Sequence, residues 1–152
     1  MIRQIETEDI IQKCSKGLLL VIVDTSVLMA IGTGRPSLES LLDVFEGKPV
    51  FLIPKSVLQE LERHLNNPRF SIRSKASVAK KVIEKSSHEF YIVKRSTTDS
   101  ADDDIYSMAL TLKRLGCKVV VATLDKDLRR RARDLGVATV FLRRTENRFE
   151  II

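Results

Sequence analysis

Carboxylates follow short apolar runs at three places in this chain, and acids in such positions can bind cations. The acids are Asp24, then Asp102, Asp103 and Asp104, and finally Asp125 and Asp127. The carboxyl ends of parallel strands open onto one crevice, so side chains that follow such strands meet there. Crowded carboxylates repel one another unless a cation lies between them, and their hard oxygen atoms favour Mg²⁺ or Mn²⁺. The pattern predicts a metal-dependent phosphodiesterase.

Alternating strands and helices would position these acids. Continuous apolar runs predict buried strands at residues 18–23, 49–53, 90–93, 118–122 and 138–142. Helical spacing predicts helices near residues 7–16, 38–45, 54–65, 72–83, 105–112 and 128–135, a helix or turn at 27–29, a break at 32–36 and a polar loop at 94–100. Right-handed crossovers between such strands predict an α/β fold of three layers, with a central parallel sheet flanked by helices. We expect one domain over residues 1–152.

Each acid also has a purely structural interpretation. Asp24 and Asp102 could cap the helices that follow them, and Asp125 and Asp127 could favour the positive end of a helix. Capping does not, however, require acids at the ends of three strands that can be neighbours. We therefore favour convergence on one site.

Glu60 is a fourth candidate, because it lies about two turns into the helix after Pro54, beside the apolar face. Its alternative is a solvated residue paired with His64 at i+4.

Other chemistries have little support. The chain lacks a P-loop and a complete dinucleotide-binding glycine motif, its two histidines lack metal-ligand spacing, and Ser26 lacks a histidine partner for a nucleophilic triad.

The net charge of +6 is unevenly spread: Lys and Arg outnumber Asp and Glu by 10 to 5 at residues 51–100 and by 11 to 8 at residues 101–152. The last third also holds clustered aspartates, so its cations gather elsewhere, notably at Lys126, Arg129, Arg130, Arg131, Arg133, Arg143, Arg144 and Arg148. A charge run is commonly a solvated helix face, but dense arginines repel one another and a nearby anion relieves this. We predict that residues 126–133 contact phosphates, whereas the later arginines extend this track or dock a protein partner.

Cys14 and Cys117 lie in different predicted elements and show no metal-ligand spacing. This favours buried, inert thiols in a reducing compartment.

The most hydrophobic segment, residues 17–31, contains an acid and falls short of the roughly 20 apolar residues that a membrane span needs. The N-terminus lacks the residue order of a secretory signal. We expect a cytoplasmic protein that does not enter a membrane.

Four ordered motifs resemble those of PIN-domain nucleases. They are a strand followed by Asp24-Thr25-Ser26, then Ile53-Pro54 with Val57 and Glu60-Leu61, then Asp102-x-x-Ile105 with Ala109, and finally residues 122–128. The resemblance covers about Leu18 to Leu142. Residues 101–104 and 122–131 look most like the PIN proteins of small-subunit ribosomal RNA processing.

The resemblance implies a role for each residue. The metal-binding and catalytic acids would be Asp24, Glu60, Asp102 and Asp125, with Asp103 or Asp127 as a further ligand or outer residue. Thr25, Ser26 and Thr123 would orient them through hydrogen bonds. Within the triplet, Asp103 or Asp104 could take the place of Asp102. Two Mg²⁺ or Mn²⁺ ions about 4 Å apart would then support hydrolysis of a phosphodiester without a protein nucleophile.

The implied activity is that of an endoribonuclease acting on single-stranded or looped RNA, in ribosomal RNA processing. The alternatives are a catalytically weak RNA-binding or ribosome-assembly factor and a VapC-type toxin ribonuclease. An aspartyl-phosphate phosphatase would need a second aspartate two residues after Asp24, where Ser26 stands. A homodimer is left open.

Overall fold

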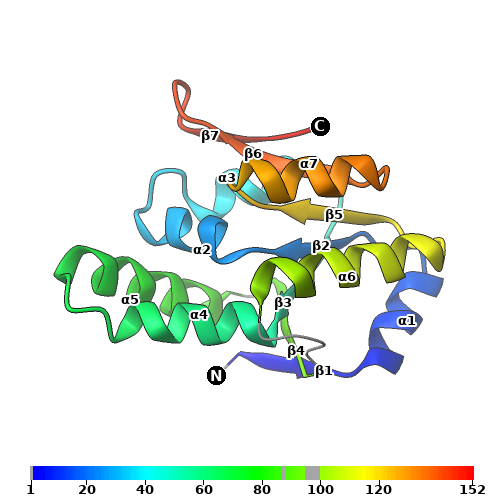
Figure 1. The fold of residues 1–152 in the computed structure, drawn as a ribbon, viewed down its shortest axis with the longest axis horizontal. Helices are drawn as coiled ribbons and strands as arrows, with labels where there is room; N and C mark the ends of the chain where they lie inside the picture. Colours follow the sequence, from blue (N-terminus) through cyan, green and yellow to red (C-terminus); the bar gives the residue numbers. More distant parts are fainter. Residues whose placement is uncertain (1, 87, 95–99) are drawn as a thin grey trace.

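The computed structural model describes residues 2–86, 88–94 and 100–152. In that part of the chain, one sheet of seven strands has the order β1-β4-β3-β2-β5-β6-β7 (Figure 1). The strands are β1 (Arg3–Ile5), β2 (Leu20–Val23), β3 (Val50–Pro54), β4 (Glu89–Val93), β5 (Val119–Ala122), β6 (Ala138–Arg143) and β7 (Arg148–Ile151). Every neighbouring pair is parallel except β6 and β7. The predicted α/β fold with a mostly parallel central sheet is confirmed.

Helices connect the parallel strands. They are α1 (Thr7–Ser15), α2 (Thr25–Gly32), α3 (Leu38–Leu42), α4 (Lys55–Leu65), α5 (Phe70–Lys85), α6 (Ala101–Arg114) and α7 (Lys126–Asp134). The path moves one way from β2 to β4 and then reverses, so right-handed crossovers place α1, α6 and α7 on one face and α2, α3 and α5 on the other. Helix α4 contacts α2, α5 and α6, and therefore lies where the two helix layers meet.

The centre of the sheet forms the core. All residues of β2, β3 and β5 are buried, as expected for parallel strands covered on both faces. Phe51 stacks on Phe90 with ring centres 4.4 Å apart, and Phe45 meets Phe51 edge-on. Burying an aliphatic or aromatic side chain stabilises the fold by about 1.5–3 kcal/mol. This core fixes the carboxyl ends of β2 and β5.

Two short strands at the edges of the sheet were not predicted. Strand β1 pairs with β4, and β7 forms a hairpin with β6. Each contains only one buried residue, Ile5 or Phe149, so neither shows a continuous apolar run. The predicted polar loop at 94–100 falls largely on residues 95–99, which lie outside the described residues.

Gly32 ends α2, rather than opening the break that was predicted at 32–36. A Cβ atom at this position would lie 2.1 Å from the carbonyl oxygen of Lys75 in α5. Helices α2 and α5 therefore pack with their backbones in close approach, which only glycine permits here. This contact supports the helix that begins directly after Asp24.

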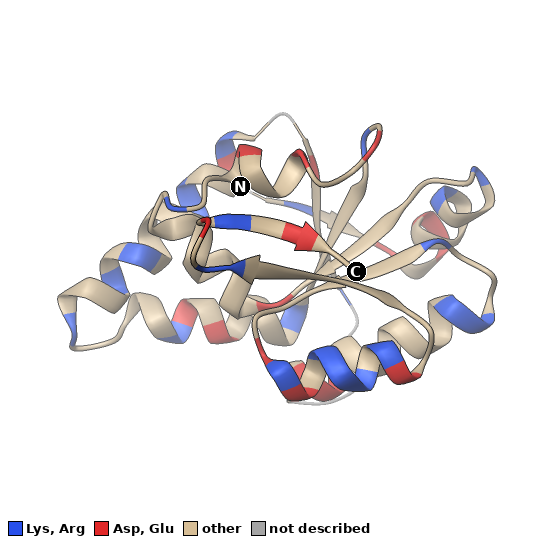
Figure 2. Ribbon diagram, turned by 90° about the horizontal axis from the view of Figure 1, so that it is seen from above, with Lys and Arg blue, Asp and Glu red and all other residues tan. Residues whose placement is uncertain are grey.

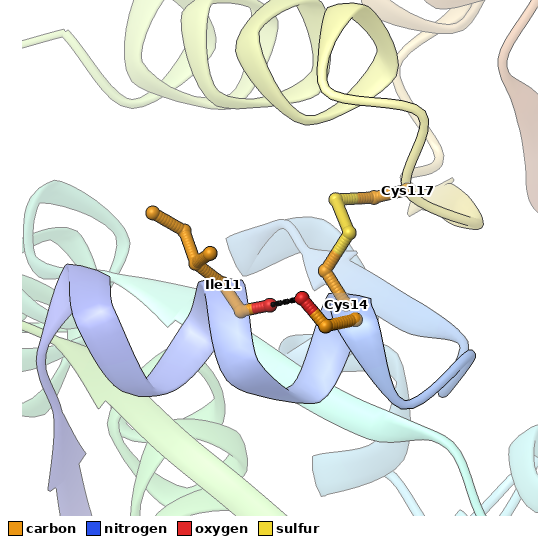
Figure 3. Close-up of a disulfide and its surroundings, with 4 residues drawn as sticks. Ile11, Cys14 and Cys117 are labelled. Carbon is orange, nitrogen blue, oxygen red and sulfur yellow. Dashed lines mark hydrogen bonds between the residues drawn. A yellow bond between two sulfur atoms is a disulfide. The ribbon is translucent and has the colours of Figure 1, made fainter.

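The prediction of two free thiols is wrong, because Cys14 and Cys117 form a disulfide (Figure 3). The bridge joins α1 to the segment between α6 and β5, across 103 positions of sequence. Both helices lie on the same face of the sheet, so the topology brings the two cysteines together. Their distance along the chain conceals this proximity.

None of the described helices has the length and apolarity needed to cross a bilayer.

We expect loss of this disulfide to destabilise the fold. A cross-link that closes a loop of about 100 residues restricts the unfolded chain, and such bonds typically contribute about 2–4 kcal/mol. Denaturant unfolding of the oxidised parent and the Cys14→Ser, Cys117→Ser double variant measures the difference. Reductant should destabilise the parent and leave the double variant unchanged. An equal response of both proteins to reductant would show that the bridge is absent in solution.

Candidate functional site

Four acids from separate parts of the chain line one cleft at the carboxyl edge of the sheet. Asp24 follows β2, Asp125 follows β5, Asp102 lies in the first turn of α6, and Glu60 lies on α4. The cleft has a volume of about 540 Å³. The other residues that line it are Thr25, Ser26, Met29, Arg63, His64, Ser100 and Ala101.

Asp24 is held by hydrogen bonds to both carboxylate oxygens. Its Oδ1 accepts from the backbone N–H of Thr25 at 2.8 Å, and its Oδ2 accepts from the Ser26 hydroxyl at 2.8 Å and the Thr123 hydroxyl at 2.7 Å. Only 6% of Asp24 is exposed. A buried carboxylate needs such donors because it has lost its hydration.

The two hydroxyl groups also bind the loop that follows β5. Ser26 Oγ accepts from the backbone N–H of Leu124 at 3.0 Å, and Thr123 Oγ1 accepts from that of Asp125 at 3.1 Å. Each hydroxyl therefore donates to Asp24 and accepts from this loop. The contacts fix the position of Asp125 relative to Asp24.

Capping and cleft lining occur together at two of the acids. Asp24 is the N-cap of α2, and Asp125 is the N-cap of α7, with its Oδ1 accepting from the N–H groups of Asp127 and Leu128. The N-cap of α6 is Ser100, so the capping interpretation of Asp102 is wrong. The carboxylate of Asp102 is thus left to the cleft.

The acidic triplet separates because successive residues of a helix point in different directions. Asp102 lines the cleft, whereas Asp103 forms a salt bridge with Arg131 at 3.6 Å. Asp104 is buried and accepts a hydrogen bond from the Ser56 hydroxyl of α4. Of the three, Asp102 is the one that joins the other cleft acids.

Two further predicted residues, Asp127 and Thr25, have their own contacts. Asp127 is outside the cleft lining and accepts from Arg130 at 3.1 Å. Thr25 holds Asp24 through its backbone N–H, while its buried hydroxyl has no hydrogen-bond partner among the described residues.

Sequence reasoning also missed Arg63 and His64 as cleft residues. Both lie on α4, three and four positions after Glu60. Residues three and four positions apart share one face of a helix, so the spacing from Glu60 could have predicted that Arg63 and His64 line the same cleft.

The four acids influence one another electrostatically. Burial raises the pKa of Asp102 above its ordinary value, and the negative charges of Asp24, Asp125 and Glu60 raise it further. The positive charge of Arg131 acts in the opposite direction. Oxygen donors of this kind suit a hard divalent cation, which would relieve the repulsion. Among the described residues, however, no three His, Cys, Asp or Glu side chains are grouped closely enough to hold an ion.

Thr123→Val tests the network around Asp24. Valine keeps the shape of the side chain but removes the hydroxyl, so both Asp24 Oδ2 and the N–H of Asp125 lose a partner. We expect the free energy of unfolding to fall by about 1–3 kcal/mol. Thr139→Val is the matched control, because Thr139 is equally buried and its hydroxyl has no partner among the described residues. Equal denaturant stability of the two variants would contradict the role of Thr123.

Asp102→Asn tests the repulsion between the acids. The pKa of Asp102 is raised on folding, so ionisation of this carboxyl group lowers the free energy of unfolding. The loss is complete at pH values above the raised pKa and disappears at pH values below the ordinary pKa. We expect Asp102→Asn to increase the free energy of unfolding of the chelator-treated protein at neutral pH, and the gain to vanish at acid pH. Asp103→Asn should show no such gain, because Asp103 is exposed and faces Arg131. A lower stability of Asp102→Asn at neutral pH would argue against repulsion.

Comparisons with known proteins bear on this cleft. Residues 21–143 match the sequence model of the PIN domain. Ribonuclease VapC9 of Archaeoglobus fulgidus is 31% identical over 128 residues, which cover 84% of this chain and 86% of that protein.

Two solved structures share the fold. That of the PIN domain endonuclease Utp24 has a TM-score of 0.63 at 24% identity, covering 87% of this chain and 90% of that chain. A domain of a functionally unknown protein from Methanocaldococcus jannaschii has a TM-score of 0.57 at 21% identity, covering 81% of this chain and 90% of that chain. The region matched by the family model contains all four cleft acids, and the chain belongs to the PIN domain family.

Proposed function

We propose that this chain is an endoribonuclease that depends on Mg²⁺ or Mn²⁺. The observation that carries the proposal is that four carboxylates, from two strand ends and two helices, line one cleft. The chain belongs to the PIN domain family, and a relative that it resembles over most of its length is named as a ribonuclease. This relationship supports RNA as the substrate. Single-stranded or looped RNA is the form that we favour.

Asp24, Glu60, Asp102 and Asp125 would hold the metal, whose charge would draw the four carboxylates closer together than they lie among the described residues. A bound divalent ion would supply Lewis acidity and neutralise charge on the phosphodiester. Asp103 and Asp127 each face an arginine, which supports an outer position for both.

The residues of the chain contribute orientation and charge. Ser26 and Thr123 fix the carboxylate of Asp24, so that it does not rotate when substrate enters. Ser26 has a positioning role in this proposal, because its hydroxyl donates to Asp24 and accepts from the backbone N–H of Leu124. Arg63 lies on the wall of the cleft, where its positive charge suits a phosphate group.

The basic residues of α7 support binding to a polyanion. Figure 2 shows Lys and Arg along this helix, in the lower centre of the view. Lys126, Arg129 and Arg133 form no salt bridge within the described part of the chain, which leaves their charge for phosphates. Arg130 is paired with Asp127, and Arg131 faces Asp103 and lies over the Tyr106 ring.

Two biological settings fit this activity. The motifs at residues 101–104 and 122–131 favour ribosomal RNA processing. A toxin ribonuclease is the second candidate, favoured by the match to VapC9 over most of the chain. A catalytically weak RNA-binding factor is the remaining alternative, and a cleavage assay separates it from both.

Asp24→Asn tests the proposed function. We expect the parent to cleave single-stranded RNA with Mg²⁺ or Mn²⁺ and to lose this activity with a chelator, whereas Asp24→Asn is inactive with either metal. The hydroxyls of Ser26 and Thr123 can rotate to accept from the new amide, so the fold should be kept, as circular dichroism would verify.

Asp9→Asn is the control for the loss of one negative charge, because Asp9 is exposed on α1, away from the cleft. Cleavage by Asp24→Asn at the parental rate, or cleavage by the parent in chelator, would exclude the metal mechanism. No cleavage by a folded, metal-loaded parent would favour the RNA-binding factor instead.

A further inference from the structure

A second concave surface lies beside the acidic cleft, where β5 and β6 end. Its volume is about 300 Å³. It is lined by Leu124, Lys126, Arg129, Phe141, Leu142 and Arg144, and we call it the basic pocket. These residues come from the loop after β5, from α7, and from the end of β6 and the turn that follows.

The basic pocket and the acidic cleft share the loop between β5 and α7. Asp125 lines the cleft, while its chain neighbours Leu124 and Lys126 line the pocket. The N–H of Leu124 donates to Ser26, so the loop is fixed to the Asp24 network. Because consecutive residues of one loop line both surfaces, we expect neighbouring nucleotides of one strand to reach both of them.

Three cations converge on this pocket without a counter-ion. No acidic side chain is among its lining residues, and Lys126, Arg129 and Arg144 form no salt bridge in the region that the structure describes. The guanidinium carbon of Arg129 lies 5.1 Å from the centre of the Phe141 ring, which orients the charge but does not neutralise it. Like charges on a concave surface repel one another, and a bound anion relieves this repulsion.

The neighbouring arginines differ in this respect. Arg143 donates to both carboxylate oxygens of Glu150, at 2.8 and 2.9 Å. Arg148 pairs with Glu150 at 2.9 Å and with Glu146 at 2.6 Å. The β6–β7 hairpin thus neutralises two of its arginines and leaves Arg144 for the pocket.

We propose that the basic pocket is a nucleotide subsite for the strand of RNA whose phosphodiester lies in the acidic cleft, a proposal that rests on the proposed function. The three cations bind a phosphate of an adjoining nucleotide. Leu124, Phe141 and Leu142 give its base or ribose an apolar surface. Such a surface accepts any base, so the subsite adds affinity and register without reading sequence.

Salt-dependent binding of a fluorescent single-stranded RNA tests the charged half of this subsite. Asp24→Asn serves as the parent, so that the RNA stays intact. Adding Arg144→Gln should weaken binding and reduce the slope of log affinity against log salt by about 0.7, the value for one phosphate contact on a single strand. Arg143→Gln is the matched control, and it should leave affinity and slope unchanged because Glu150 already holds that guanidinium.

Phe141→Leu tests the apolar half in the same assay. We expect affinity to fall by about fivefold or more, with no change in the salt slope, because contact area is lost but no charge. Circular dichroism of each variant checks that the fold is kept.

Either of two results would overturn the subsite: a parental slope for Arg144→Gln, or an equal loss for Arg143→Gln. Unchanged RNA binding by the pocket variants would assign this surface to a protein partner. Cleavage by the active chain separates the two proposals. If that chain cleaves RNA while Arg144→Gln binds like its parent, the nuclease function holds and the subsite fails. If it does not cleave but the slopes differ as expected, the nuclease function fails and the pocket is an RNA-binding site.

Discussion

The buried carboxylate of Asp24 is the interaction on which the rest of the site depends. A charge removed from water at the end of a core strand is tolerable only when donors surround it. Here the donors come from the first turn of α2 and from the end of β5. Because Ser26 and Thr123 also accept from the loop after β5, the same hydrogen bonds join two central strands and position Asp125. Burial of one charge thereby sets the shape of the cleft.

The cleft works against the stability of the fold that carries it. Four acids line it, and the raised pKa of Asp102 reflects both its burial and the negative charges of the other three. The stability must come from elsewhere, and the fully buried strands β2, β3 and β5 supply it. Acids that repel one another stay close only when rigid elements hold them, because on flexible loops they would move apart before a cation binds.

The sequence predicted the centre of the fold well and its edges poorly. Strands covered on both faces must be apolar throughout, so β2, β3 and β5 are visible as continuous runs. Strands β1 and β7 each bury a single side chain, and partners distant in sequence determine their pairing. The bridge between Cys14 and Cys117 escaped prediction for the same reason, since only the crossovers of the chain bring α1 beside the end of α6.

At the site, residue types were predictable but the direction of each side chain was not. Three consecutive aspartates in α6 have three surroundings: the cleft, an arginine, and a buried hydroxyl. Similarly, the number of arginines near the C-terminus says little about free charge, because the turn to β7 brings Glu146 and Glu150 against some of them only. The loop after β5 shows the principle most directly. Asp125 and Lys126 are adjacent, yet one lines an acidic surface and the other a basic one. Hydrogen bonds from its backbone fix this loop, so two adjacent residues of opposite charge lie on different surfaces. A count of charges along the sequence would treat the pair as neutral.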